Sequence, residues 1–196
     1  SYLRRLAQRH QITLVTFEKS RDWDDRPRRA ALQAEVEKAG IRWTALRYHK
    51  APTLVATTYD LAVGLQVCGV LAVARRVEIV HARSYVPAVI GLALKRLLGL
   101  RFLFDMRGFW PDEMVDGGLW TRRSWLYRFA KLLERRLLQA ADVVVVLTDR
   151  GVSELRALPW RNGRQPRCLV IPTCTNMDVF HPAHRLASRG GRPGEE

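Results

Sequence analysis

The stretch Arg101-Phe-Leu-Phe-Asp-Met-Arg-Gly-Phe-Trp-Pro-Asp-Glu113 changes character abruptly after its fourth residue. Residues 101–104 form an apolar run, which predicts a buried strand. The remainder predicts a loop in which charged side chains stand among aromatic ones: Asp105, Arg107, Asp112 and Glu113. Ligands bind open α/β sheets at the carboxyl ends of parallel strands, so this strand end is a candidate site. The alternative is ordinary helix capping and surface ion pairing.

A second predicted strand, residues 77–80, also ends in polar residues, His81-Ala-Arg-Ser-Tyr85. Two strands that deliver polar groups to one edge of a sheet favour a binding site over a purely structural edge.

Strands and helices alternate along the chain, which predicts βαβ units and a parallel sheet. The strands are almost wholly apolar, as expected when helices cover both faces. We therefore predict an α/β fold with a Rossmann-like, doubly wound parallel sheet. The predicted strands are 11–17, 41–46, 77–80, 101–104, 142–147 and 168–171, and the helices are 2–9, 28–39, 57–74, 86–98, 122–140 and 149–157.

The first of these helices, residues 2–9, has no strand before it. In a doubly wound sheet such a helix follows a central strand and a glycine-rich turn, so we expect the chain to be a piece of a longer protein. Neither G-x-G-x-x-G nor G-x-x-x-x-G-K-[ST] occurs in it.

The chain has 196 residues, enough for one domain with a sizeable core. Its 33 Lys and Arg against 19 Asp and Glu give a net charge of +14, which attracts nucleic acid, nucleotide sugars or anionic lipid alike.

Cys68, Cys168 and Cys174 show no metal-ligand spacing, and we expect free thiols. The apolar run 61–74 is too short to span a membrane and predicts a buried helix.

The order of motifs resembles the N-terminal domain of family-four glycosyltransferases with the GT-B fold. The resemblance covers roughly residues 2–182, and its motifs are specific through their order and spacing. It rests on residues 2–17, His81-Ala-Arg-Ser84, Phe104-Asp-Met-Arg-Gly-Phe-Trp-Pro-Asp-Glu113, residues 140–148 and the crossover Val170-Ile-Pro-Thr-Cys-Thr-Asn-Met-Asp-Val-Phe-His-Pro182.

The resemblance implies an acceptor-side domain, residues 1–182, of a retaining transferase that takes a sugar from a UDP- or GDP-linked donor without a metal. The acceptor is expected to be a saccharide or a lipid-linked intermediate of cell-surface polysaccharide synthesis, in the cytoplasm or at the inner face of the membrane. Residues 183–196 are expected to be a flexible tail or a truncated linker. The second, C-terminal domain of the GT-B fold, with its paired-glutamate motif, is absent from the sequence, so we expect the activity to belong to a longer parent protein.

The chain departs from the family pattern in places. Many members carry histidine where Arg107 stands, some close relatives carry aspartate where Gly108 stands, and Asn176 takes the place of a common aspartate.

Two residues are predicted to be catalytic. Arg107 would stabilise the departing phosphate through charge-assisted hydrogen bonds, a task that Arg83 would also suit. Asp105 would orient an acceptor hydroxyl or hold Arg107. The alternatives are that Arg107 only pairs with Asp105 or Asp112, and that Asp105 caps the amides of the loop.

The remaining candidates are predicted to bind substrate: His81, Arg83, Ser84, Trp110, Asp112 and Glu113. His81 would polarise a hydroxyl or bind phosphate, and Trp110 and Phe109 would stack on a sugar ring. The alternatives are a hydrogen-bonded structural histidine and aromatic side chains that anchor the loop. The five histidines show no metal-ligand spacing.

The predicted helix at 122–140 is rich in arginine. It fits either an anionic membrane surface or a core-facing stripe with a solvated basic side. Its apolar side is predicted to comprise Trp125, Leu126, Phe129, Leu133 and Leu137.

Two other classes of function are open to such a chain. One is a non-catalytic binder of nucleic acid or anionic carbohydrate, although the arginines are spread over several elements and no recognition motif appears. The other is a carbohydrate-binding or scaffold protein that has lost its donor domain.

Overall fold

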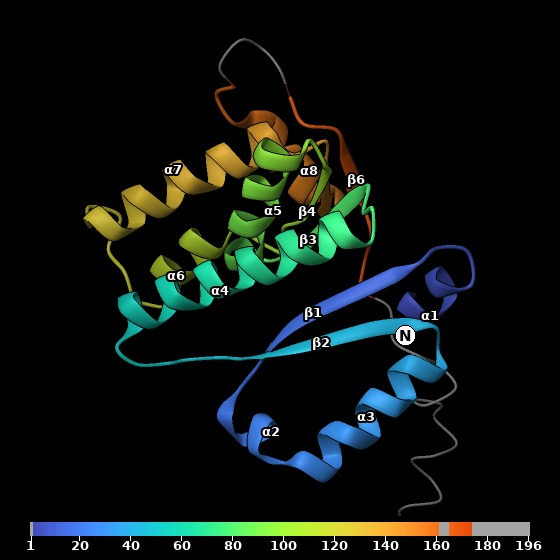
Figure 1. The fold of residues 1–196 in the computed structure, drawn as a ribbon. Coiled ribbons are helices and arrows are strands. Elements are labelled where there is room, and N and C mark those ends of the chain that lie inside the picture. The colour runs from blue at the N-terminus through green and yellow to red at the C-terminus, as the bar shows by residue number, and fades with distance from the viewer. Residues whose placement is uncertain (1, 161–164, 174–196) are drawn as a thin grey trace, which may run out of the picture.

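The computed structural model describes residues 2–160 and 165–173 (Figure 1). Within them lie the strands β1 (Ile12–Glu18), β2 (Ile41–Arg47), β3 (Ile79–Arg83), β4 (Arg101–Asp105), β5 (Val143–Val146) and β6 (Cys168–Val170). The helices are α1 (Tyr2–Ala7), α2 (Ser20–Asp24), α3 (Arg26–Lys38), α4 (Thr53–Ala74), α5 (Tyr85–Leu98), α6 (Trp110–Asp116), α7 (Trp125–Ala140) and α8 (Asp149–Ala157).

All strand pairs are parallel, and helices lie on both faces, which confirms the predicted α/β, Rossmann-like class. The strands form two sheets, β1-β2 and β3-β4-β5-β6, where the sequence predicts one. In the described part of the chain, β1 pairs only with β2, so no hydrogen bond joins it to β3. Figure 1 shows α4 bridging the two sheets, with α3 on the other side of β1-β2. That a central strand belongs before α1 stays a prediction.

Local signals in the sequence set several helix ends. The Asp25 side chain accepts a hydrogen bond from the Arg28 backbone N–H at 3.0 Å and caps α3. Gly40 and Gly99, which follow α3 and α5, take φ values of +77° and +71°. Such values suit glycine, so both helices end where the sequence predicts.

The core lies between the larger sheet and its helices. Phe102 and Phe104 of β4 and Val144 of β5 are fully buried against α5 and against Leu137 of α7. This cluster holds β3, β4 and β5 in register, so it also fixes where their carboxyl ends lie.

The prediction that the apolar run 61–74 is a buried helix is wrong. The helix is longer, and its stretch Leu54–Ala74 has the length and apolar composition of a membrane span. Only 17% of an 18-residue segment within that stretch is buried. Core helices of soluble proteins pass the same length test. The helix docks through small or polar residues one or two turns apart, Ala56, Asp60, Gly64 and Ala72, and its larger apolar side chains are half-buried or exposed.

Asp60 is the charged residue among those that dock α4, and the sequence does not predict its buried position. Its carboxylate accepts hydrogen bonds from the His49 backbone N–H at 2.9 Å and lies 2.6 Å from His49 Nδ1. A buried carboxylate needs such partners, and this one ties the end of β2 to α4.

Three predicted boundaries need correction. The strand predicted at 77–80 is Ile79–Arg83, so His81 and Arg83 belong to β3 and not to a loop. The predicted loop after β4 contains α6, which begins at Trp110 and has Pro111 in its first turn. Ser20–Asp24 forms the short helix α2, which was not predicted.

The predicted apolar side of the helix at 122–140 is wrong in part. The helix begins at Trp125, where the Ser124 hydroxyl accepts from the Tyr127 backbone N–H at 3.2 Å. Leu137 and Leu138 face the core, whereas Trp125 and Phe129 are exposed. Glu134 is also on the buried side of the helix.

Cys68 and Cys168 are free thiols, as predicted, and burial raises the pKa of each above its usual range. Cys174, Asn176, the crossover after Thr173, the domain boundary at 182 and the predicted tail 183–196 lie outside the described residues.

Candidate functional site at the carboxyl ends of the strands

The parallel register of β3 and β4 brings three predicted site residues together. Arg83 is paired with Asp105, and His81 lies two residues earlier on the same side of β3. The Asp105 Oδ2 atom lies 3.6 Å from His81 Nε2 and 3.8 Å from Arg83 Nε. The sequence thus correctly predicts that the ends of these two strands form one cluster of charges.

Asp105 is buried, and its second oxygen has no partner. Among the described residues, Oδ1 is the only buried side-chain nitrogen or oxygen atom that makes no hydrogen bond. Buried polar atoms nearly always find partners, so such an exception points to a group that a ligand completes. In the part of the chain that the structure describes, neither Asp105 oxygen accepts from a backbone N–H. The alternative that this side chain caps the loop amides is therefore wrong.

The His81 imidazole is kept neutral at pH 7. Burial lowers its pKa below the usual 6.5, the carboxylate of Asp105 opposes this, and the Arg83 guanidinium lowers it further. A neutral imidazole can donate through one nitrogen and accept through the other.

We expect His81 to titrate below its usual value of about 6.5. Replacing Asp105 with asparagine should lower the His81 pKa further, because the carboxylate is the group that raises it. As pH drops, the His81 imidazole of the unfolded chain takes up its proton at a higher pH than that of the folded protein. The free energy of unfolding should therefore fall as pH drops below about 6.5. An NMR titration of the imidazole protons measures the His81 pKa in the unmodified protein and in the Asp105→Asn variant. A His81 pKa that rises in Asp105→Asn would contradict this arrangement.

The backbone is strained at the end of each strand. Ser84 and Arg107 have φ values of +74° and +66°, which non-glycine residues rarely adopt. The Ser84 N–H donates to the Asp105 carbonyl at 2.8 Å, and the Gly108 N–H donates to the Met106 carbonyl at 2.8 Å, closing a tight turn about Arg107. Strain of this kind persists where the surrounding structure enforces it, and it clusters at binding sites.

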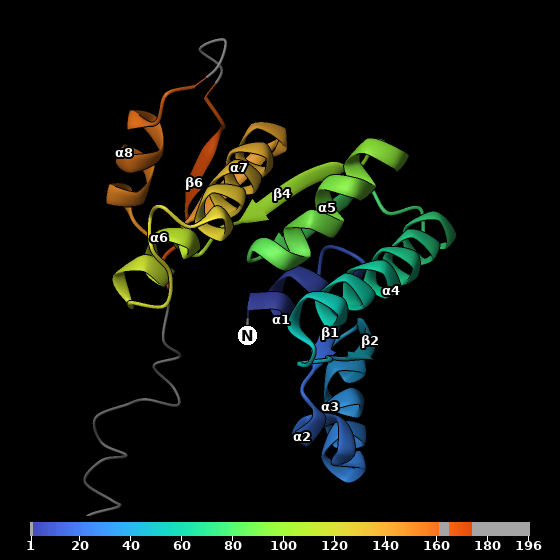
Figure 2. The same cartoon turned by 90° about the vertical axis from the view of Figure 1, so that its left-hand side faces the viewer.

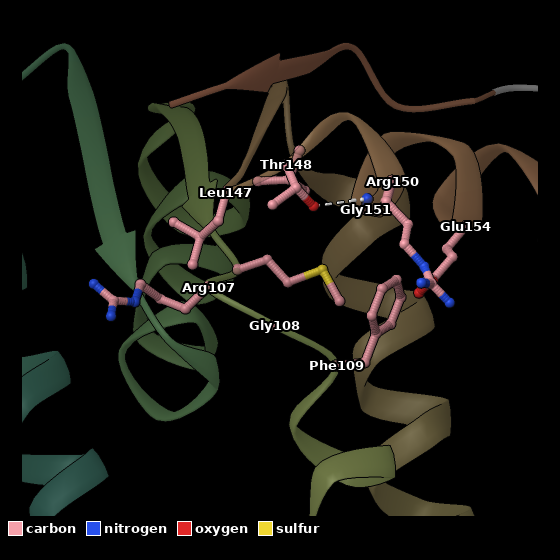
Figure 3. A pocket seen from close by; sticks show the side chains of 10 residues that line it. Arg107, Gly108, Phe109, Leu147, Thr148, Arg150, Gly151 and Glu154 are labelled. Carbon is pink, nitrogen blue, oxygen red and sulfur yellow. Dashed lines mark hydrogen bonds and ion pairs between the residues drawn. The ribbon is translucent and has the colours of Figure 1, made fainter. Parts of the chain in front are cut away.

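Arg107 is exposed and is not tied to the loop carboxylates. In the described part of the chain it makes no ion pair with Asp105 or Asp112, so the alternative that it pairs with either is wrong. Figure 3 shows its guanidinium pointing away from Arg150 and Glu154. Its charge is therefore available to a ligand.

Trp110, Asp112 and Glu113 lie on α6, away from the His81–Asp105 cluster. The Trp110 ring packs against Tyr85 and Trp120, with ring centroids 5.6 Å and 5.0 Å away. This is the geometry of an anchor for the loop. Glu113 is exposed, and a Cβ on Gly108 would come 2.1 Å from its Oε1 atom, so the Glu113 carboxylate lies against the backbone next to Arg107.

Asp112 is held by two donors on α7. It accepts from the Tyr127 hydroxyl at 2.8 Å and from Lys131 Nζ at 2.9 Å. Burial alone would raise its pKa, but the two hydrogen bonds and the Lys131 charge lower the pKa below its usual range. Asp112 thus has a structural role in addition to its predicted role in binding.

A buried polar network beneath the loop was missed in the sequence. The Tyr85 hydroxyl lies 2.6 Å from Glu134 Oε2 and 3.1 Å from the Gly108 carbonyl, while Lys131 binds the other Glu134 oxygen. Burial, and then the Glu134 charge, raise the pKa of Tyr85, so its hydroxyl stays protonated. The sequence offers one signal for this network, since Glu134 is the only acidic residue on α7.

Two cavities flank the loop. One of about 140 Å³ lies between the Arg107 turn and the start of α8, where Thr148, Arg150 and Glu154 line it (Figure 3). The other, about 410 Å³, is lined by Phe109, Asp112, Glu113 and Lys131 among others. Of the predicted residues, His81, Arg83 and Asp105 form the strand-end cluster. Arg107, Asp112 and Glu113 line the cavities. Arg150 and Glu154 were not predicted.

In residues 2–160 and 165–173, no group of three His, Cys, Asp or Glu side chains is placed to hold a metal ion.

An open parallel α/β sheet with charged groups at the carboxyl ends of its strands defines a Rossmann-like ligand-binding domain. Residues 1–174 match the family model of the glycosyl transferase 4-like domain. The chain therefore belongs to the glycosyl transferase 4-like family, whose members transfer a sugar from a donor to an acceptor. A search of curated proteins found no match.

Proposed function

We propose that this chain is the acceptor-side domain of a retaining glycosyltransferase that moves a sugar from a UDP- or GDP-linked donor to a saccharide or lipid-linked acceptor. The pathway would be cell-surface polysaccharide synthesis, in the cytoplasm at the inner face of the membrane. A second domain would bind most of the donor, and no metal would be required.

The observation that carries the proposal is the buried Asp105 carboxylate with one unpartnered oxygen at the edge where β3 and β4 end. A sugar hydroxyl is a donor that would complete it, since a carboxylate accepts and cannot donate. The neutral His81 ring beside it offers a further polar contact to the same hydroxyl.

Two arginines stand near this edge of the sheet. Arg83 lies beside Asp105, and Arg107 follows in the strained turn. A guanidinium binds phosphate oxygens bidentately and keeps its charge at any physiological pH. Arg107 would then stabilise the negative charge that grows on the leaving nucleoside diphosphate, which is where a fixed cation lowers a barrier most.

In the parent protein, replacing Arg107 with alanine should lower kcat about a hundredfold, the usual cost of removing one positioned donor to developing charge. The assay is release of nucleoside diphosphate from UDP- and GDP-hexoses in the presence of acceptor. Arg107→Lys should recover only part of the rate, because lysine keeps the charge but not the bidentate geometry.

Arg42→Ala is the matched control, since Arg42 is exposed near the start of β2, away from the carboxyl ends of the strands. Unchanged turnover by folded Arg107→Ala would remove the proposed role. Salt-sensitive binding to generic duplex DNA, with no nucleotide-sugar turnover by the parent, would favour the rival basic binding protein.

A further inference from the structure

The outer side of α7 presents large apolar side chains to solvent. Trp125, Phe129 and Leu132 are 69%, 58% and 53% exposed. They follow one another at spacings of four and three residues, so they form one stripe along the helix. A surface helix normally turns such a stripe inward, but α7 buries its other side through Ala130, Glu134, Leu137 and Leu138.

The charged residues on the same side of α7 are all basic. Arg128 and Arg136 are exposed on the stripe, and Arg122 and Arg123 are exposed just before the helix. The only acid on α7, Glu134, is 2% exposed and is already bound by Lys131 and Tyr85. In the described part of the chain, none of these four arginines has a carboxylate within ion-pair distance.

Exposed apolar side chains also occur on α5 and α4. Helix α5 contacts both α7 and α4, and Figure 2 shows the three side by side. Leu97 of α5 is exposed, as are Val70 and Val73 of α4. Exposed apolar side chains are therefore not confined to the stripe on α7.

We propose that the stripe Trp125, Arg128, Phe129, Leu132 and Arg136 of α7 docks the chain on the surface of a membrane that contains anionic lipid. Aromatic and aliphatic side chains enter the boundary between headgroups and acyl chains, while arginines beside them bind lipid phosphates. A tryptophan at the end of the stripe suits the interfacial zone. The inference deepens the proposed function, since a lipid-linked acceptor would lie at that surface, but its test requires no sugar transfer.

Other occupants fit the stripe less well. A second copy of the chain would place arginine against arginine across a symmetric interface. A nucleic acid would satisfy the arginines but leave Leu132 without an apolar partner. An anionic lipid surface satisfies both sets of side chains in one plane.

The test is co-sedimentation of the full chain with vesicles of phosphatidylcholine alone and of phosphatidylcholine mixed with phosphatidylglycerol. We expect binding to the mixed vesicles that weakens as salt is raised, and little binding to the neutral ones. Phe129→Ser should lower the partition coefficient about tenfold, because one aromatic side chain is no longer inserted. Arg128→Gln and Arg136→Gln should each lower it about fivefold.

Leu32→Ser on α3 and Arg42→Gln on β2 are matched controls, since both residues are exposed on other elements. Circular dichroism establishes that each variant is folded. Equal partition into neutral and anionic vesicles, or an unchanged value for Phe129→Ser, overturns the proposal. So does a dimer that Phe129→Ser abolishes in the absence of vesicle binding, which would assign the stripe to a second copy. Loss of nucleotide-sugar turnover leaves the vesicle result unaffected, so the two proposals fail separately.

Discussion

Replacing Glu134 with alanine is expected to lower the free energy of unfolding by about 3–5 kcal/mol, the usual cost of removing one partner from a buried ionic network. Glu134 is 2% exposed and accepts hydrogen bonds from Tyr85 and Lys131. Within the described residues, the loss of Glu134 leaves the buried Tyr85 hydroxyl with the Gly108 carbonyl as its hydrogen-bond partner. It leaves the half-buried Lys131 with Asp112 and the face of the Phe109 ring. Equilibrium denaturation in urea, followed by circular dichroism, measures the loss.

Glu134→Gln separates the charge from the shape. It keeps the volume and an acceptor, so a smaller loss is expected, about 1–3 kcal/mol. Glu37→Ala on α3 is the control, because Glu37 is exposed and makes one surface hydrogen bond with Gln33. If Glu134→Ala costs no more than this control, the network does not stabilise the fold.

Replacing Phe102 with alanine should also cost about 3–5 kcal/mol. Phe102 is fully buried and stacks with Phe104 at a centroid distance of 6.2 Å. The ring fills the space above Gly91 of α5, where a Cβ would come 2.6 Å from Phe102 Cε2. Truncating the ring leaves a cavity at the centre of the core, between β4 and α5.

A double-mutant cycle with Gly91→Ala tests this packing directly. Alone, Gly91→Ala should destabilise by about 1–3 kcal/mol through overpacking. In the Phe102→Ala background the clash with the ring disappears and a 3.3 Å contact with the Ala82 Cβ is left. The same substitution should then become nearly neutral or stabilising, since alanine favours a helix. Leu97→Ala, exposed on the same helix, is the control. Additive effects of the two core substitutions would contradict the contact.

Most of the secondary structure could be predicted from local patterns. Gly40 and Gly99 end helices where predicted, and the run of four valines before Leu147 is a buried strand. Errors arose where tertiary contacts decide. The sequence predicts a loop over residues 110–116 because their charges and aromatic side chains follow a strand. In the structure, Trp110–Asp116 form a helix that has Pro111 in its first turn and packs on α7.

The site was predicted in outline and not in its connections. Parallel pairing places the ends of β3 and β4 together, and hence the Arg83–Asp105 contact. The partners of Asp112, by contrast, come from α7, more than a dozen residues away in sequence. Neither spacing nor composition predicts which of several basic side chains reaches a given carboxylate.

The sequence by itself determined the alternation of strands and helices, the α/β class and the collection of charged residues at two strand ends, because these depend on local patterns of apolar and polar residues. Only the tertiary structure decided which side of α7 faces the core and that the strands divide into two sheets. Among the described residues, it also decided that Asp105 keeps an unpartnered oxygen and that Arg107 makes no ion pair with Asp105 or Asp112. Each of these depends on contacts between residues far apart in the chain. The free energy gained from such tertiary contacts exceeds the intrinsic preference of a segment for helix or strand.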